Sequence, residues 1–260
     1  MSLGPDEHGR NTADSAGHPW AGRSFGENTA AADDGSADPA LLAALTAFVS
    51  GDAQSESVVE AFRQARLLIP LVAHAGDVGH TAEGHLVDKT QELSIVTVAG
   101  PDGRKVLPAF TSVAAMSAWD PKARPVPAAG PRVALAAASE QTELVVIDPT
   151  GPTEFVLRRP AVYALSTGAQ WLPPHRDPAV IAAFDASIDD EPDAAAIRLE
   201  SGDPRHRLQA PELVVAVAVR PGLDAAAVNA LVARLSDRWA TSTAIANGVD
   251  SMTLRLVAAD

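Results

Sequence analysis

LSIVTVAGPDGRKVLPAFTSVAAMSAW, residues 93–119, is the stretch of this sequence that decides the fold. Branched apolar residues lead into the Gly-Pro-Asp-Gly turn at 100–103, where glycine supplies positive φ and proline presets its own φ. Val106, Leu107 and Phe110 then return the chain as a second strand. We predict a β-hairpin followed by a short helix that runs from Val113 to Trp119.

Two hydroxyl residues, Thr111 and Ser112, stand where that helix should begin. A hydroxyl at this position accepts a hydrogen bond from the free amides of the first helical turn. The alternatives are a nucleophile at Ser112 or an anion bound at the helix start. No partner base is signalled, so we interpret these residues as a helix cap.

Composition excludes several classes of function. The 260 residues carry a formal net charge of −13, and no segment is basic enough to suggest a nucleic acid or an anionic membrane as partner. The absence of cysteine excludes disulfides and thiolate metal sites. The first residues lack the pattern of a signal peptide, and no apolar run approaches the ~18 residues of a membrane span. We expect a soluble, cytoplasmic protein.

The chain divides into four regions, which together predict an α+β fold: two small α/β sandwich domains, with mixed sheets packed by helices, behind a disordered N-terminal arm. Trp20 and Phe25 in the arm could form a docking motif or be incidental anchors, and we favour the second interpretation. The regions are an acidic arm (1–37), a first domain (38–170), a proline-rich and acidic linker with a short helix (171–193) and a second domain (194–260).

In the first domain, Asp38-Pro39 and Gly51 predict the ends of one helix. A second helix is predicted to start at Ser57, with Glu60 completing a capping box. The apolar stretch at 67–72 suits a strand, and Pro70 predicts that this strand lies at a sheet edge.

The proline-rich segment 121–131 predicts an extended surface connector, followed by a short helix from Arg132 to Ser139. The apolar stretch 144–147 predicts a central strand, and Asp148-Pro149 a turn into a hairpin mate at 153–158. Arg158 and Arg159 could receive a phosphate or a partner carboxylate. We favour the alternative, that both are solvated at the strand end.

These elements in this order resemble the N-terminal domain of the SseB family over roughly Pro39 to Thr167. The most specific matches are Phe110-Thr111-Ser112 with Trp119, and Val146-Ile147-Asp148-Pro149. The family usually has Asn where this chain has Asp148, and such a turn tolerates either residue. SseB proteins are described as enhanced-serine-sensitivity proteins of unsettled biochemical role, so the resemblance implies a fold more than an activity.

The second domain is predicted to contain strands at 196–200, 213–219 and 252–256. A helix capped by Asp224 lies between the last two, with an apolar stripe that ends at Trp239. This strand-strand-helix-strand order, with the turn at 200–204, resembles the SseB C-terminal domain.

The sequence contains no recognisable catalytic or nucleotide-binding motif. The loop from His74 to Thr90 holds Asp77, His80, Glu83, His85 and Asp88, but their spacing matches no zinc signature. We therefore favour a solvated loop over a metal site there, and we expect no cofactor.

We expect a non-enzymatic protein-interaction or regulatory module whose partner is another protein or a second copy of the chain. The alternatives are a protein that senses a small ligand such as an amino acid, suggested by the family's name, and an enzyme without a recognisable motif. We also hypothesise that the helix cap, the turn at Asp148 and the arginine pair lie near each other. The candidate binding residues are Phe110, Thr111, Ser112, Trp119, Asp148, Pro149, Arg158 and Arg159.

Overall fold

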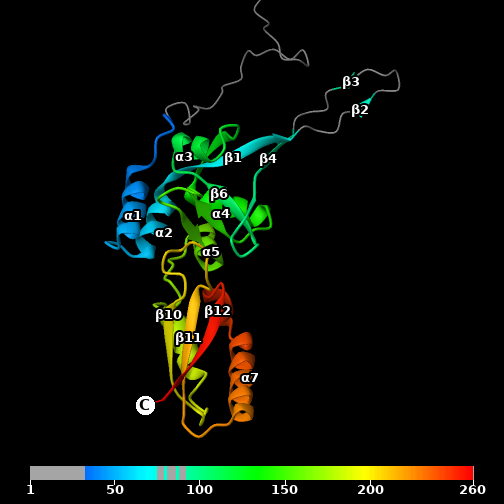
Figure 1. The fold of residues 1–260 in the computed structure, drawn as a ribbon. Helices are drawn as coiled ribbons and strands as arrows, with labels where there is room; N and C mark the ends of the chain where they lie inside the picture. The colour runs from blue at the N-terminus through cyan, green and yellow to red at the C-terminus, as the bar shows by residue number, and fades with distance from the viewer. Residues whose placement is uncertain (1–32, 75–78, 81–85, 88–91, 260) are drawn as a thin grey trace, which may run out of the picture. The chain divides into compact units, whose positions relative to one another are not determined.

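The computed structural model describes residues 33–74, 79–80, 86–87 and 92–259 (Figure 1). The predicted arm as far as residue 32, with Trp20 and Phe25, therefore lies outside the described residues. The same is true of Asp77, Glu83, His85 and Asp88 in the loop that we weighed as a metal site. His80 lies in the two-residue strand β2 (Gly79–His80), which pairs with β3 (Leu86–Val87).

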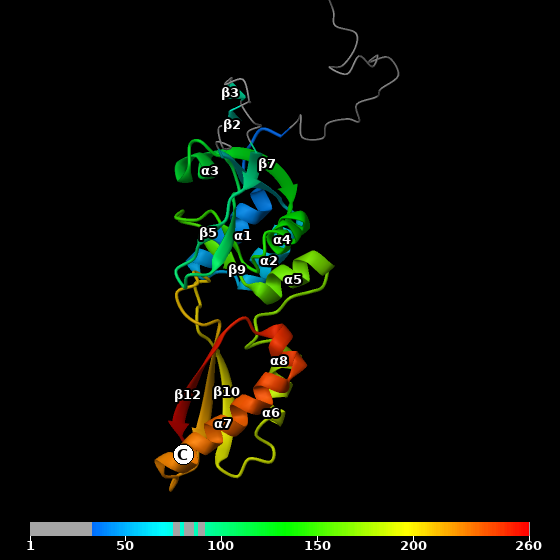
Figure 2. The ribbon, with the colours of Figure 1, turned by 90° about the vertical axis from the view of Figure 1, so that its right-hand side faces the viewer.

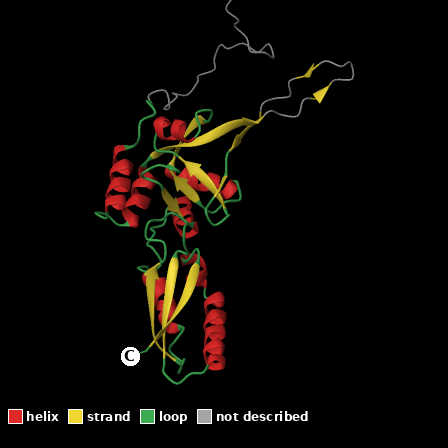
Figure 3. Cartoon of the chain, viewed as in Figure 1, coloured by secondary structure: helices red, strands yellow, loops and turns green. Residues whose placement is uncertain are grey.

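The chain has an α+β fold, as predicted (Figure 3). Besides the β2–β3 pair, the described residues between 39 and 167 form two sheets. Their strand orders are β4-β1-β7 and β5-β6-β8-β9, joined by a bridge between Leu68 and Phe110. The elements are α1 (Pro39–Ser50), α2 (Ser55–Gln64), β1 (Arg66–His74), β4 (Glu92–Ile95), β5 (Val98–Ala99), β6 (Lys105–Ala109), α3 (Val113–Trp119), β7 (Arg124–Ala129), α4 (Gly130–Ser139), β8 (Val145–Ile147), β9 (Phe155–Leu157) and α5 (Arg159–Thr167).

Helix α1 has the predicted ends. The Asp38 carboxylate accepts hydrogen bonds from two first-turn amides, and Gly51 ends the helix at φ 86°. The prediction for α2 is wrong in its start. That helix begins at Ser55, and its N-cap residue is Gln54, whose side chain forms no capping hydrogen bond. Because Ser57 lies within the helix, the predicted capping box between Ser57 and Glu60 is not formed.

The edge position predicted for Pro70 is also wrong, because β1 lies between β4 and β7. Pro70 pairs with Pro125, and its carbonyl oxygen accepts a hydrogen bond from the Val96 amide on the β4 side. In an antiparallel ladder the N–H and C=O of one residue face the same neighbour. The missing donor of Pro70 therefore falls just beyond the end of β4 at Ile95, where it costs no ladder bond.

Two other strand predictions need correction. The hairpin across the turn at 100–103 exists between β5 and β6, but the first predicted strand divides, and β4 joins β1 in the other sheet. The proline-rich connector is not a free surface segment, because Arg124–Ala129 pairs with β1 along six residues as β7. Alternate prolines permit this at an edge strand.

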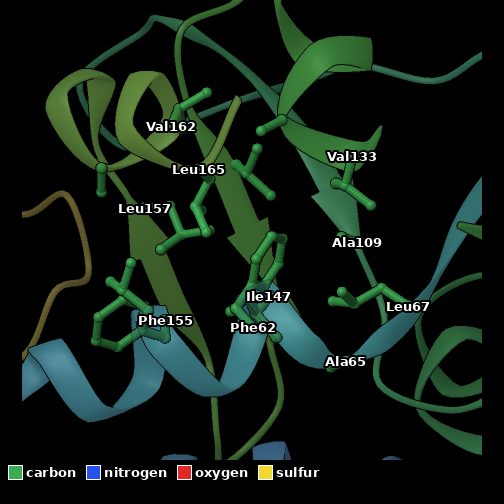
Figure 4. Packing of buried hydrophobic residues seen from close by; sticks show 14 of the residues in the cluster. Phe62, Ala65, Leu67, Ala109, Val133, Ile147, Phe155, Leu157, Val162 and Leu165 are labelled. Atoms are coloured by element: carbon green, nitrogen blue, oxygen red, sulfur yellow. The ribbon is translucent and has the colours of Figure 1, made fainter. Parts of the chain in front are cut away.

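Helices α1, α2, α4 and α5 bury apolar side chains against one face of the strands. In Figure 4, Phe62 of α2, Ile147 of β8 and Leu165 of α5 share the interior of this core, and each is fully buried. The strand residues in the core alternate along β8 and β9, as expected for one face of a sheet.

The remaining part of the chain has its own core. Its sheet has the order β10-β11-β12, with β11 and β12 parallel, and α6, α7 and α8 cover one face (Figure 2). Asp224 caps α7 as predicted, whereas α8 was not predicted. No described helix is long and apolar enough to cross a membrane. The elements are α6 (Pro178–Ala186), β10 (Ala194–Ser201), β11 (Leu213–Val219), α7 (Ala225–Thr241), α8 (Thr243–Gly248) and β12 (Met252–Ala258).

Candidate functional site

The four-stranded sheet is apolar on both faces. One face packs against the helices of the main core, while Val106, Val146 and Val156 point to the other. On that second face their buried neighbours are Leu144 and Leu208, with Val98 partly buried beside them, instead of a helix. Strands that are apolar on both faces normally have a covering layer on each face. This second face, which no helix of the main core covers, is therefore a candidate binding surface.

Helix α3 packs against Leu68 and Phe110, and its last residue, Trp119, reaches a cavity on that face. Ser112 caps the helix as predicted, since its hydroxyl oxygen accepts a hydrogen bond from the Ala115 amide at 3.1 Å. The cap prediction is wrong for Thr111, whose hydroxyl donates to Asp148 instead. The ring of Trp119, at the end of the helix, lies 5.2 Å from the ring of Phe110 between centroids. Phe110 is fully buried, and it therefore fixes where Trp119 can stand.

The turn after β8 is held by a buried carboxylate. Asp148 accepts hydrogen bonds from the Thr111 amide and hydroxyl, both at 2.8 Å, and from the Thr153 hydroxyl at 3.3 Å. Its φ of 44° lies in the left-handed region, which Asp and Asn adopt more readily than other side chains. Burial raises the pKa of this carboxyl, and the hydrogen bonds from Thr111 and Thr153 oppose that shift. Asp148 thus ties the start of α3 to the turn and presents Pro149 and Thr150 to the surface.

A cavity of about 270 Å³ lies over the second face, and we call it the sheet hollow. Val106, Val146 and Val156 form part of its lining, and Trp119 and Pro149 are the predicted site residues that reach it. The other predicted residues of this region hold these two in place without lining the cavity. The ring of Phe110 contacts Trp119, Ser112 caps the helix of Trp119, and Asp148 bonds to Thr111. β5 and the turn at 100–103 contribute Val98 to Pro101.

The loop from Gly202 to Glu212, between β10 and β11, completes the sheet hollow with Arg207 and Leu208. The carbonyl oxygen of His206 accepts a hydrogen bond from the Val156 amide at 2.7 Å. The loop therefore pairs with the outer edge of β9, the last strand of the sheet. Leu208 reaches Gly100 so closely that a Cβ there would lie 2.8 Å from the Leu208 Cδ2 atom. Sequence reasoning missed this loop, since it was recognised only as a turn.

The rim of the sheet hollow is polar and paired. Arg207 lies 3.5 Å from the Glu154 carboxylate, whose other oxygen accepts a hydrogen bond from the Thr150 amide at 2.7 Å. Arg207 also donates to the carbonyl oxygen of Pro152 at 3.4 Å. An apolar floor inside a ring of polar groups is the arrangement found at the centre of protein interfaces.

Arg158 and Arg159 do not belong to this site. They follow β9 at the end opposite Asp148, because Leu157 pairs with Val145 while Ile147 pairs with Phe155. Three residues of strand, about 10 Å, separate the two ends. The hypothesis that the cap, the turn and the arginine pair lie together is therefore wrong for the arginines. The expectation that Arg158 is solvated is wrong too, since only 2% of its surface is exposed.

Arg158 instead donates hydrogen bonds to Asp203 at 2.6 Å and to Asp250 at 3.2 Å. Asp250 also accepts hydrogen bonds from both terminal nitrogens of Arg104, at 2.9 and 2.8 Å. Arg159 donates to the carbonyl oxygens of Ala246 and Val249. Nothing local in the sequence marks these partners, since 45 residues separate Arg158 from Asp203.

Two further ionisable groups in this region are shielded from water: Glu212 is buried and His206 is half-buried. The imidazole of His206 stacks on Phe155 with 4.5 Å between ring centroids, and burial lowers its pKa to about 4. Glu212 accepts a hydrogen bond from the Asp250 amide at 2.7 Å through Oε2, while Oε1 has no described partner. Burial raises the pKa of Glu212 to about 7.

The sheet hollow can bind a partner mainly through apolar packing. Its lining is mainly valine, proline, tryptophan and leucine, and its rim charges are paired with each other. Within the described ranges, no three His, Asp or Glu side chains gather closely enough to hold a metal ion. The arrangement suits the binding of an apolar side chain.

Residues 40–164 match the family model of the SseB protein N-terminal domain. The match confirms the resemblance predicted for the first domain over these residues, which include Phe110 to Trp119 and Asp148-Pro149. No curated protein and no solved structure matches the chain.

Proposed function

We propose, from the SseB match over residues 40–164, that this chain is a two-domain SseB-family protein and a non-enzymatic protein-binding module. In this proposal its working surface is the sheet hollow, which receives an apolar side chain of a partner protein. The observation that carries the proposal is the cavity of about 270 Å³ over a sheet face whose valines lie beneath no helix of the main core.

Size and lining indicate the kind of group that fits. A buried Leu, Ile or Phe side chain gains about 1.5–3 kcal/mol relative to an exposed one. Trp119 offers a large ring at one wall, and aromatic walls are frequent where a few residues dominate binding. Arg207 and Glu154 at the rim would keep water from the seated side chain and bond to the partner's backbone.

The second domain takes part in this function in our proposal. We assign it to the SseB C-terminal type from its element order and its turn at 200–204, and it supplies Arg207 and Leu208 to the sheet hollow. The hollow would then be incomplete in the first domain alone. The cytoplasmic location and the identity of the partner, another protein or a second copy, remain predictions.

The experiment uses peptides selected for binding to the full chain from a random library. Ala99 is exposed and lines the sheet hollow, so Ala99→Trp should fill it without disturbing the core. Ala240→Trp, at an exposed position in α7, is the matched control. We expect selected peptides to share an apolar anchor and to bind Ala99→Trp at least ~10-fold more weakly, a difference of ~1.4 kcal/mol. Equal affinity for Ala99→Trp and the unchanged chain would reject the sheet hollow as the working surface.

A further inference from the structure

A second cavity, of about 570 Å³, is bounded by α4, α5 and the segments around the starts of β6 and β8. We call it the α4–α5 cavity, and the two helices lie side by side in both views (Figures 1 and 2). It shares no lining residue with the sheet hollow. Its volume falls within the range of small-molecule sites, about 300–1,000 Å³.

The lining of the α4–α5 cavity combines an apolar floor with polar groups. Ala134, Ala138, Leu144 and Val162 provide the apolar part. Tyr163 is the most exposed large side chain among the apolar and aromatic residues of the described chain, at 66%, although it stands on a helix that packs in the main core. An exposed aromatic ring beside an apolar floor can stack on a planar ligand.

Two cations of this lining remain available to a ligand. Lys105 is exposed and forms no ion pair or side-chain hydrogen bond within the described part of the chain. Arg159 is anchored through one terminal nitrogen, Nη2, to the carbonyl oxygens of Ala246 and Val249. Its other terminal nitrogen, Nη1, forms no hydrogen bond within the described part of the chain and can donate to a ligand. A guanidinium that is already held in place loses less entropy when it binds an anion.

The other charges of the lining do not cancel these two. Arg104 is balanced by Asp102 and Asp250, at 2.6 and 2.8 Å. Glu143 lies 3.9 Å from Arg159, and its side chain is 70% exposed, so the pair is loose and weak. The α4–α5 cavity therefore keeps an excess of positive charge in a chain whose net charge is −13.

We infer that the α4–α5 cavity binds a small aromatic carboxylate. Lys105 and Arg159 hold the carboxylate, and the ring lies on the apolar floor against Tyr163. This site is independent of the sheet hollow, so the two proposals can fail separately.

The test uses indole-3-acetate as the probe, titrated into the full chain by calorimetry, with the neutral indole-3-acetamide alongside. Lys105→Gln should weaken binding of the acetate about tenfold, whereas Lys122→Gln, the same charge change in the turn after α3, should leave it unchanged. Ala138→Trp should abolish binding by filling the cavity, and Ala99→Trp in the sheet hollow should have no effect. The amide should bind at least about tenfold more weakly than the acetate.

Thermal unfolding of each variant establishes that it is folded, and Lys105→Gln changes only an exposed side chain. Equal affinity of the acetate for Lys105→Gln and Lys122→Gln would overturn the inference. Equal affinity of the acetate and the amide would also overturn it. So would the absence of saturable acetate binding up to about 10 mM, which is about tenfold above a Kd of 1 mM.

Discussion

Arg158 and Asp203 form an ion pair with 2.6 Å between Nη2 and Oδ2, and their side chains are only 2% and 6% exposed. The pair ties the end of β9 to the start of the loop that completes the sheet hollow, since Asp203 belongs to that loop. Arg158 also donates to Asp250, to the Ser251 hydroxyl and to the carbonyl oxygen of Ala210. A buried charge with this many partners is costly to leave unpaired.

Arg158→Ala should lower the free energy of unfolding by about 3–5 kcal/mol, because Asp203 and Asp250 lose a buried cation. Arg158→Lys should recover only part of this loss, since an ammonium cannot reproduce the fork of the guanidinium. The matched control is Arg255→Gln, which breaks a half-exposed pair with Glu200 and should cost about 1 kcal/mol or less. Urea unfolding monitored by circular dichroism measures all three. Similar costs for Arg158→Ala and Arg255→Gln would show that the buried pair does not stabilise the fold in this way.

Glu212 should make the protein less stable as the pH rises. Its pKa is about 7 when folded, above the ordinary value of 4.5, so the folded state holds the proton between these values and the unfolded state does not. The contribution is present in full below pH 4.5 and is lost as the pH rises through 7. Glu212→Gln should remove this slope and raise stability above pH 7 by on the order of 2–3 kcal/mol. Urea unfolding from pH 4.5 to 8 measures it, and an unchanged slope in the variant would contradict the prediction.

His206 should act in the opposite direction. Its pKa is about 4 when folded, below the ordinary 6.5, so between these values only the unfolded state takes up the proton. Stability from this group is present above pH 6.5 and is lost as the pH falls through 4. The slopes of His206 and Glu212 therefore oppose each other between about pH 4.5 and 6.5. We expect His206→Phe, which keeps a ring on Phe155, to become more stable relative to the unchanged chain as the pH falls through that window. The same urea series detects this, and a constant difference between the two proteins would exclude it.

Several helices could be predicted because their end signals are local, whereas α8 and the start of α2 were not predicted correctly. Asp38, Ser112 and Asp224 each cap a helix with a side chain that bonds to its own first turn. The strand partners could not be predicted in the same way. The central place of Pro70 depends on Pro125, 55 residues away in the chain, and neither neighbourhood shows the pairing.

The site could be predicted only in part. Trp119 and Pro149 line the sheet hollow, and both were found through the resemblance of their surroundings to a family pattern. Leu208 and Arg207 were missed because a loop residue becomes part of a site only through a distant contact. One signal was present: the uninterrupted apolar run Phe155-Val156-Leu157 indicates a strand that is buried on both faces.

Asp148 gives the sharpest test of how the sheet hollow is built. Asp148→Asn keeps a side chain that tolerates φ 44°, and its amide can still accept from the Thr111 N–H, so we expect a change of less than about 1 kcal/mol. Asp148→Ala loses all three side-chain hydrogen bonds and leaves a Cβ at positive φ without compensation, and it should cost about 2–4 kcal/mol. The control Asp224→Ala removes an exposed helix cap, for about 1 kcal/mol.

The charge of Asp148 adds a dependence on pH. Burial raises its pKa, so its contribution to stability is present at low pH and is lost as the pH rises through the folded value. Asp148→Asn cannot titrate and should gain on the unchanged chain as the pH rises. Urea unfolding at pH 4 and pH 8 measures this gain. If Asp148→Asn proves as damaging as Asp148→Ala at both pH values, the fold needs the negative charge of the carboxylate. The view that an uncharged side chain at 148 can also hold α3 to the turn would then be wrong.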